Sequence, residues 1–414
     1  MMDKILRAHA DAITTGAIRA VQPDEAVARA LAGQAFPGRV VLVAAGKAAW
    51  QMAKAAHACL GDRIEKGVVI TKYHHVKGPI ANFECYEAGH PVPDENSFRG
   101  TQAALELVQE LTERDTVLFL LSGGGSALFE KPLVSSEELQ NITAQLLACG
   151  ADIVEMNTVR KRLSAVKGGR FAVACAPARV FSVVLSDILG DPLDMIASGP
   201  ACPDSSTCEQ AVAIARKYGL KLSTDAWDCL NRETPKELNN VTNRITGSVR
   251  ELCRAAEQVC QELGYMPILL TDRLCCQAKE AGSFLASILQ TYEGRGENLA
   301  FLAGGETVVR LTGKGLGGRN QELALAAAEG ISGCAGAAVF SIGSDGTDGP
   351  TDAAGGYVDH TTAEALRAAG VDIYDVLKEN DAYHALQKVG GLIITGPTGT
   401  NVNDVAVALL RQGE

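Results

Sequence analysis

Three short apolar runs constrain the fold of this chain more than any other feature, because each is followed at once by a turn. The runs cover residues 39–45, 116–121 and 180–185. Strands that are apolar on both faces are typical of a parallel sheet with helices on both sides. Helical patterns lie between the runs, for example at 97–111 and 137–147. The sequence therefore predicts alternating strands and helices that form an α/β domain.

A second alternation of helices and strands follows residue 246. Residues 223–246, between the two alternations, are polar and contain Pro235 and an Asn-Asn pair, a composition typical of a domain boundary or hinge. With 414 residues, the chain also exceeds what one hydrophobic core usually supports. We therefore expect a larger, Rossmann-like parallel-sheet domain over 1–240 and a smaller α/β region over 241–414. The elements predicted in the second region are helices at 248–263, 277–290 and 321–328 and strands at 267–271, 298–303 and 337–342.

Charge and composition exclude several classes of function. The net charge of −11 and the lack of a long basic run argue against nucleic-acid binding. No window approaches the ~18 uninterrupted apolar residues of a membrane span, and the start of the chain lacks the apolar core of a signal peptide. The twelve cysteines form no CxxC pair and the seven histidines show no metal-ligand spacing, so no zinc site is predicted. We expect a cytoplasmic protein whose partners are small molecules.

The segment Ser122-Gly123-Gly124-Gly125-Ser126 follows the second apolar run and precedes helix-compatible residues. Consecutive glycines allow the backbone to turn sharply, so that free N–H groups and a helix N-terminus can face an anion. A bound nucleotide or phosphorylated substrate is the first hypothesis, although the segment contains no P-loop lysine. The alternative is a tight strand-to-helix turn that binds nothing.

Charged side chains follow the first and third runs. Lys47 comes directly after Gly46, where its ammonium group would lie at the carboxyl edge of the sheet near the start of a helix. The alternative is a surface lysine with a solvated head. Asp187, Asp191 and Asp194 follow the third run, and carboxylates at a strand end beside a phosphate loop suit Mg²⁺. Aspartates also cap helices and build turns, but Asp187, nearest the strand end, is the preferred ligand.

A basic helix is predicted between the glycine loop and the third run. Asn157 and Arg160 are three residues apart and share a face that could grip a carboxylate or a phosphate. Lys161 and Arg162 follow directly. A solvated basic face is the alternative interpretation.

Glycine-rich turns in the second half of the chain also end in polar residues. Glu306 follows one of them, and Arg319 stands near a predicted helix start, beside a loop that could close on a ligand. Another turn carries Asp345 and Asp348 but lacks the EF-hand spacing. A metal or ligand-shaping role and plain turn chemistry both stay open for this last turn.

Nine motifs occur in a fixed order along the chain. They are AAGKAA (44–49), EAGHPVPD (87–94), LSGGGSAL (121–128), NTVRKRLS (157–164), SDILGDP (186–192), GGET (304–307), GGRNQE (317–322), GSDGTDGPTD (343–352) and GPTGTNVND (396–404). This order resembles that of the class II glycerate kinases, also called glycerate 2-kinases, whose carboxy-terminal part is the MOFRL domain. The resemblance runs nearly from end to end of the chain.

The resemblance implies transfer of the γ-phosphoryl group of ATP to D-glycerate, usually at the 2-hydroxyl, with Mg²⁺. The reaction would take place in a cleft between a Rossmann-like domain and the MOFRL domain, here at 298–408. Lys47 and Arg319 match the lysine and arginine proposed as catalytic in the family. The chain departs from the family pattern at Tyr73–Gly78 and Leu274–Gln277, which bears on local loop shape more than on the reaction. A homo-oligomer is the default expectation for such a metabolic enzyme.

The residues and the resemblance together give one set of candidates. The catalytic candidates are Lys47, Arg319 and Asp187, and the Mg²⁺ ligands are Asp187 and Asp191. Nucleotide phosphates are assigned to Ser122, Gly123, Gly124, Gly125 and Ser126. Substrate binding is assigned to Asn157, Arg160 and Glu306. Asp345 and Asp348 are secondary loop candidates with a metal or ligand-shaping role.

Two other functions stay open. One is an NAD(P)H-dependent hydroxypyruvate reductase, because relatives of this family have carried that label. Residues 44–47 do not form GxGxxG, however, and Lys72 stands where a dinucleotide site favours an acidic residue. The other is a non-catalytic phosphosugar-binding protein. The carboxylates in both halves argue against it, because a pure anion receptor gains nothing from them.

Overall fold

The computed structural model describes residues 2–412 and divides the chain into two compact units. We call Ala26–Thr246 the parallel-sheet unit, and Met1–Glu25 with Gly247–Glu414 the mixed-sheet unit. This division differs from the predicted domains, 1–240 and 241–414, mainly in the place of the first helix.

Helix α1 (Lys4–Ala20) belongs to the mixed-sheet unit. It packs against α11 (Val249–Glu262), and Gly16 allows a close approach, since a Cβ there would lie 2.6 Å from a methyl carbon of Val259. The two helices are more than 200 residues apart along the chain, so no local pattern reveals their contact.

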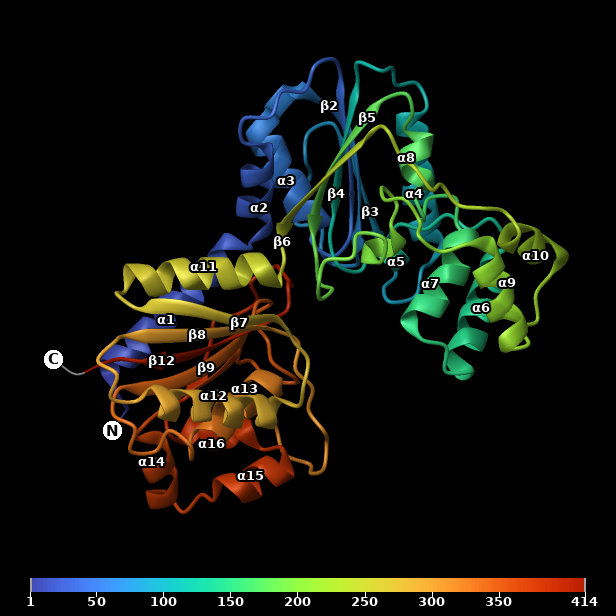
Figure 1. Ribbon diagram of the computed structural model, residues 1–414. Coiled ribbons are helices and arrows are strands. Elements are labelled where there is room, and N and C mark those ends of the chain that lie inside the picture. Colours follow the sequence, from blue (N-terminus) through green and yellow to red (C-terminus); the bar gives the residue numbers. More distant parts are fainter. Residues whose placement is uncertain (1, 413–414) are drawn as a thin grey trace. The chain divides into compact units, whose positions relative to one another are not determined.

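The parallel-sheet unit contains a six-stranded sheet in the order β3-β2-β1-β4-β5-β6 (Figure 1). Strands β1 to β5 pair in parallel, as the apolar runs predict. The order reverses at β1, because β2 and β3 extend the sheet on one side and β4 begins the other. The strands are β1 (Val40–Ala45), β2 (Ile64–Lys72), β3 (Phe83–Ala88), β4 (Thr116–Leu121), β5 (Arg179–Leu185) and β6 (Val241–Gly247).

This reversal sets the carboxyl ends of β1 and β4 side by side. Ala45 lies opposite Leu121, so the turn at Gly46 and the loop at Ser122 begin at the same level of the sheet. Ligands of open α/β sheets bind at such a switch point, beyond the carboxyl ends of the strands. The topology therefore joins two of the predicted motifs.

The side chains of β1 alternate between two hydrophobic cores. Val41 and Val43 belong to one core, and Leu42 and Ala44 belong to the other. Helices α4 and α8 cover the first face of the sheet, whereas α2 and α3 cover the second (Figure 1). Burial on both faces explains why the strand is an uninterrupted apolar run.

Helices α6, α7, α9 and α10 group around a smaller core of their own within this unit (Figure 1). The helices of the unit are α2 (Pro23–Leu31), α3 (Ala49–Leu60), α4 (Glu95–Val108), α5 (Gly125–Leu128), α6 (Ser136–Ala148), α7 (Ile153–Arg162), α8 (Arg170–Ala174), α9 (Cys208–Lys217) and α10 (Thr224–Leu230), with 3₁₀ turns η1 (Gly61–Arg63) and η2 (Ile196–Ser198).

The mixed-sheet unit contains the second sheet, in the order β11-β10-β9-β12-β8-β7. Strands β7 and β8 are parallel, whereas the other neighbours are antiparallel. The last strand, β12, thus lies between β8 and β9. The strands are β7 (Met266–Leu274), β8 (Leu299–Gly305), β9 (Ala337–Gly343), β10 (Gly355–Asp359), β11 (Leu392–Ile393) and β12 (Asp404–Leu410).

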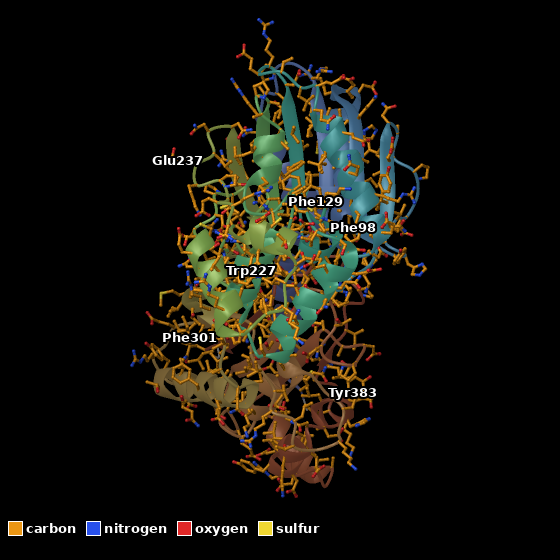
Figure 2. The ribbon with its side chains drawn as sticks, turned by 90° about the vertical axis from the view of Figure 1, so that its right-hand side faces the viewer. Phe98, Phe129, Trp227, Glu237, Phe301 and Tyr383 are labelled. Carbon is orange, nitrogen blue, oxygen red and sulfur yellow. The ribbon has the colours of Figure 1, made fainter. Side chains whose placement is uncertain are left out.

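Helices cover both faces of the second sheet, with α11 on one face and α12 and α13 on the other (Figure 1). Figure 2 labels Phe301, from β8, in the core of this unit and Phe129 in a core of the parallel-sheet unit. The remaining helices are α12 (Ala278–Tyr292), α13 (Arg319–Ala327), α14 (Thr362–Ala368), α15 (Ile373–Glu379) and α16 (Ala382–Lys388).

The polar stretch 223–246 contains more regular structure than a linker. Helix α10 begins at Thr224, and β6 adds an edge strand to the parallel-sheet unit. Among the described residues, no helix combines the length and the apolar composition that a membrane span needs.

Candidate active site

The turn after β1 and the loop after β4 are joined by hydrogen bonds. The N–H of Lys47 donates to the carbonyl of Gly123 (2.9 Å), and the N–H of Ala48 donates to Oγ of Ser122 (3.1 Å). Gly46 has a φ of +128°, and a Cβ there would lie 2.2 Å from the Ser122 hydroxyl oxygen. Glycine is therefore required at position 46 for the two turns to meet.

Main-chain N–H groups of the loop are available to an anion. Those of Gly123, Gly124 and Ser126 have no acceptor within residues 2–412, and Gly124 is left-handed with a φ of +85°. Successive N–H groups around such a residue form a concave anion-binding nest. The expected helix contributes little, because α5 has only one turn and sums few peptide dipoles. The nest, rather than a helix end, is what suits a phosphate.

Three titratable side chains lie against the backbone of this loop. A Cβ on Gly123 would lie 2.3 Å from Oδ2 of Asp187. A Cβ on Gly124 would lie 3.1 Å from Nε2 of His90 and 3.2 Å from Cγ of Lys47. The missing side chains of the two glycines thus allow these groups to approach the main chain. The structure brings together the predicted Lys47 and Asp187 and adds His90, to which the sequence assigns no role.

The end of β2 and the segment after it hold the backbone of Lys47. Its carbonyl accepts a hydrogen bond from Oγ1 of Thr71 (3.2 Å) and lies 3.0 Å from Nδ1 of His75. His75 belongs to the segment 73–78, in which the chain departs from the family pattern. Lys47 is half-buried, which argues against a fully solvated surface lysine.

Asn157 and Arg160, both on α7, reach the same loop. The hydroxyl of Ser198 donates to Oδ1 of Asn157 (3.0 Å) and lies 3.2 Å from Oγ of Ser126. Nη2 of Arg160 donates to the carbonyl of Ser126 (3.4 Å), while Nε of Arg160 is buried with no partner among the described residues. An unpaired buried donor is costly unless a ligand or water satisfies it. Ser198 is a contact that sequence reasoning missed.

The other basic residues of α7 are buried. Lys161 is 2% exposed and lies 2.9 Å from Asp204, and Arg162 is 0% exposed and lies 2.8 Å from Glu233. A solvated basic face is therefore wrong for these two residues. Their charges are neutralised inside the protein.

The loop after β5 carries the predicted Mg²⁺ ligands. Asp191 has a φ of +55°, and its Oδ1 is buried with no hydrogen-bond partner within the described range. Asp194 instead lies 3.5 Å from the ammonium group of Lys161. An unpaired buried carboxylate oxygen on the same loop as Asp187 fits a divalent cation that also takes phosphate oxygens. Asp187 and Asp191 thus suit the ion better than Asp194 does.

In the mixed-sheet unit, two carboxylates hold Arg319, the first residue of α13. Its Nε and Nη2 donate to the two oxygens of Asp404, with an Nη2–Oδ1 distance of 3.0 Å, and Nη1 lies 3.1 Å from Oε1 of Glu306. Asp404 is buried at the start of β12, opposite Gly305 and Gly343. Although burial opposes the charge, the hydrogen bond and charge of Asp404 raise the pKa of Arg319. The guanidinium is a permanent cation in a fixed orientation.

Asp348 caps the start of the same helix. It accepts hydrogen bonds from the N–H groups of Asn320 (3.1 Å) and Gln321 (2.9 Å). Burial nevertheless raises the pKa of Asp348 to about 6. Asp345 accepts from the N–H of Thr347 (3.0 Å) within its own turn. Both aspartates therefore make the bonds of turn and cap chemistry.

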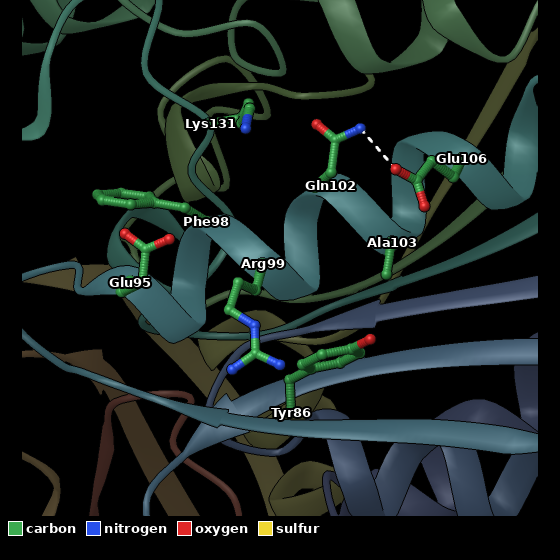
Figure 3. A pocket seen from close by; sticks show the side chains of 8 residues that line it. All are labelled: Tyr86, Glu95, Phe98, Arg99, Gln102, Ala103, Glu106 and Lys131. Atoms are coloured by element: carbon green, nitrogen blue, oxygen red, sulfur yellow. Dashed lines mark hydrogen bonds between the residues drawn. The ribbon is translucent and has the colours of Figure 1, made fainter.

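Two other features involve none of the predicted site residues. A pocket of 240 Å³ opens along α4 and is open to solvent (Figure 3). Its lining residues are Tyr86, Glu95, Phe98, Arg99, Gln102, Ala103, Glu106 and Lys131. Within the described residues, Cys208, Glu209 and Glu233 form the one cluster of three possible metal ligands, but Glu233 already pairs with Arg162.

These observations define the class of protein. It is a two-unit α/β protein with a nest of main-chain N–H groups, unpaired within residues 2–412, at the switch point of its parallel sheet and an arginine held by two carboxylates in its mixed sheet.

Comparison with known proteins identifies the family. Residues 9–231 match the model of DUF4147, a domain of unknown function, and residues 299–404 match the MOFRL family. The D-glycerate 2-kinase of Thermotoga maritima is 55% identical over 96% of this chain and 97% of its own length, and the glycerate 2-kinase of Pyrococcus horikoshii is 42% identical over 95% of each. The crystal structure of glycerate kinase from Thermotoga maritima has a TM-score of 0.94 at 53% identity, covering 99% of this chain and 100% of that chain. The chain belongs to the glycerate kinase family, as its motifs indicate.

One relative carries a different name. A protein of Agrobacterium vitis, 38% identical over 90% of this chain and 87% of its own length, is provisionally named a hydroxypyruvate reductase. A test of activity has to include that reaction.

Proposed function

We propose that the protein transfers the γ-phosphoryl group of ATP to the 2-hydroxyl of D-glycerate, giving 2-phosphoglycerate and ADP. The observation that carries the proposal is the nest of free N–H groups at Ser122–Ser126, with Lys47 and Asp187 against it. Phosphoryl transfer needs positioning and neutralisation of charge more than covalent catalysis, and this arrangement supplies both. The names of the relatives supply the substrate class.

The residues of the nest divide the work of the reaction. The N–H groups of Ser122–Ser126 bind phosphate oxygens, and Lys47 stabilises the charge on the transferred group. The 2-hydroxyl oxygen forms a new bond to phosphorus, the bond from phosphorus to ADP breaks, and the hydroxyl proton passes to a base. Asp187 is the candidate for that base or for a metal ligand.

Mg²⁺ would be held by Asp187 and Asp191 and would supply neutralisation of the phosphate charges. Asn157 and Arg160 bind the carboxylate of glycerate, which pairs with the unsatisfied Nε of Arg160. Arg319 acts as the second cation of the reaction, next to Glu306. Its action across a cleft between the domains, and a cytoplasmic location, stay predictions.

The ³¹P NMR spectrum of the protein with Mg-ATP and D-glycerate tests the proposal. ADP and a phosphomonoester coupled to the single proton of carbon 2 are expected. An ester coupled to the two protons of carbon 3 would still support a glycerate kinase, but it would place the transferred phosphoryl group on the 3-hydroxyl. L-glycerate is the matched control for the acceptor, and samples without Mg²⁺ are the control for the metal.

Oxidation of NADH or NADPH by hydroxypyruvate, measured on the same protein, tests the reductase. Reduction of hydroxypyruvate, together with no ADP formation from ATP and D-glycerate, would overturn the proposal that the protein is a kinase. Binding of phosphosugars without either reaction would leave a non-catalytic receptor.

A further inference from the structure

His90 is a half-buried residue of the motif at 87–94, and neither the sequence nor the proposed reaction gives it a role. It follows β3, two residues after the strand ends at Ala88. In a parallel sheet, this position lies at the same edge as the turn after β1 and the loop after β4. The topology therefore brings the imidazole to the phosphate loop.

The Cδ2 and Nε2 atoms of the ring lie close to Gly124. A Cβ on Gly124 would lie 3.0 Å from Cδ2 and 3.1 Å from Nε2 of His90, so Nε2 is among the ring atoms nearest to the loop. Lys47 reaches the same glycine with its side-chain stem, and Asp187 lies over the preceding one. The N–H groups of both glycines lack acceptors among the described residues. An anion in the nest would lie close to Nε2 of the imidazole.

The imidazole also lacks a partner within the protein. Neither ring nitrogen of His90 makes a hydrogen bond within residues 2–412, whereas Nδ1 of the nearby His75 lies 3.0 Å from the carbonyl of Lys47. Burial and the charges of Lys47, Lys72 and His75 lower the pKa of His90. A lowered pKa favours the neutral ring, which has one N–H donor and one acceptor to offer.

We propose that His90 is a substrate-contacting residue, whose Nε2 donates a hydrogen bond to an anionic oxygen bound at the Ser122–Ser126 loop. That oxygen belongs either to the transferred phosphoryl group or to the carboxylate of the acceptor. The inference deepens the proposed function and rests on it, since it takes the loop as the anion site.

Histidine NMR of the full-length protein tests the contact without a substitution. The imidazole signal of His90, assigned by its loss in His90→Gln, is followed during separate titrations with inorganic phosphate and with D-glycerate. A saturable shift with phosphate places Nε2 on the phosphoryl group, and a shift with D-glycerate alone places it on the acceptor. A signal that moves with neither anion would overturn the proposal.

Kinetics of two variants supply the second test. His90→Leu removes the donor and is expected to lower kcat/KM about 10- to 100-fold, as for a lost hydrogen bond to a charged group. His90→Gln can place an amide N–H near the position of Nε2 and should retain most of the activity. His384→Gln, in the mixed-sheet unit and exposed, is the control for a histidine change elsewhere.

The two proposals fail in different ways. If the wild type phosphorylates glycerate and His90→Leu is as active as the wild type, the contact is wrong and the kinase stands. If the wild type shows no phosphoryl transfer but the His90 signal shifts with phosphate, the contact stands and the reaction is wrong.

Discussion

The two units present charge in opposite ways. In the parallel-sheet unit, Nε of Arg160, the imidazole of His90 and three loop N–H groups have no partner within the described part of the chain. In the mixed-sheet unit, the guanidinium of Arg319 is held by Asp404 and Glu306. The first set of groups is free to bind a ligand or water, whereas the second is paired within the protein itself.

Sheet topology accounts for the difference. The carboxyl ends of parallel strands lie at one edge of the sheet, so the loops that follow them gather there. The main-chain groups of these loops are not used in hydrogen bonds between strands. In the mixed sheet, antiparallel neighbours fix Asp404 between Gly305 and Gly343, and this register places the carboxylate that orients Arg319. We therefore expect substitutions in the parallel-sheet unit to change ligand binding and the charge available to the ligand. Substitutions in the mixed-sheet unit should instead change the orientation of Arg319.

The largest effect is expected from Lys47→Ala, which removes the cation of the nest. The expected fall in kcat is about 10²- to 10³-fold, the usual cost of a lost group that stabilises transition-state charge. Steady-state kinetics at saturating Mg-ATP and D-glycerate measure it. Lys77→Ala, an exposed lysine of the neighbouring segment, is the control. A kcat within threefold of the wild type for Lys47→Ala would remove this lysine from the chemistry.

Asp348→Asn tests whether burial of the Asp348 carboxyl group in the mixed-sheet unit makes the stability of the protein depend on pH. Because the pKa of Asp348 is about 6 in the folded protein and 3.8 ordinarily, the folded state binds the proton more tightly. The raised pKa therefore stabilises the folded state by about 3 kcal/mol at most. This contribution is fully present below pH 4 and is lost as the pH rises through 6.

Urea unfolding followed between pH 4 and 7 measures this change. The wild type is expected to lose stability over that range more steeply than Asp348→Asn does. Asp352→Asn, at an exposed position of the same loop, should retain the wild-type slope. Equal slopes for the wild type and Asp348→Asn would contradict the role of burial.

Strands buried on both faces could be predicted from the sequence, and edge strands could not. The apolar runs locate β1, β4 and β5 to within a residue, because burial on both faces leaves no polar position. Strands β3 and β6 lie at the edges of the sheet, and their polar residues interrupt the apolar runs by which the inner strands are recognised. Strand β12 lies between β8 and β9 and pairs with β8, which precedes it by about a hundred residues. No local pattern encodes a pairing between such distant segments.

The same reasoning separates the site residues that could be predicted from those that could not. Lys47, Asp187 and the glycine loop follow strand ends, which meet at one edge in any parallel sheet. The contacts of His90 and Ser198 with the loop depend in addition on local backbone conformation: Gly124 leaves room for the ring of His90, and Ser198 has a φ of +61°. The motif at 87–94 contains His90 but does not show its contact, and Ser198 lies outside the motifs; both contacts depend on tertiary packing.

Asp404→Asn tests the orientation of the arginine. An amide in place of the carboxylate loses one charge and turns an N–H toward the guanidinium, so Arg319 should no longer be held side-on. We expect kcat to fall about 10- to 100-fold, the cost of hydrogen bonds to a charged group, with a smaller change in KM. Asp375→Asn, exposed in the same unit, is the control. A change in KM alone would show that Asp404 acts on binding instead.

The smallest effect is expected from Ser198→Ala, in the parallel-sheet unit. The hydroxyl of Ser198 holds Oδ1 of Asn157, and its loss leaves that amide free to rotate away from the substrate. A net hydrogen bond of ~1 kcal/mol corresponds to an increase of about fivefold in KM for D-glycerate, with kcat little changed. Ser198→Gly is the matched variant, because glycine accepts the positive φ without strain and lacks the same hydroxyl. Equal increases in KM for both variants would assign the effect to the hydroxyl. An increase in Ser198→Ala alone would assign it to backbone strain, and the contrast between the open site of the parallel-sheet unit and the fixed arginine of the mixed-sheet unit would be weaker.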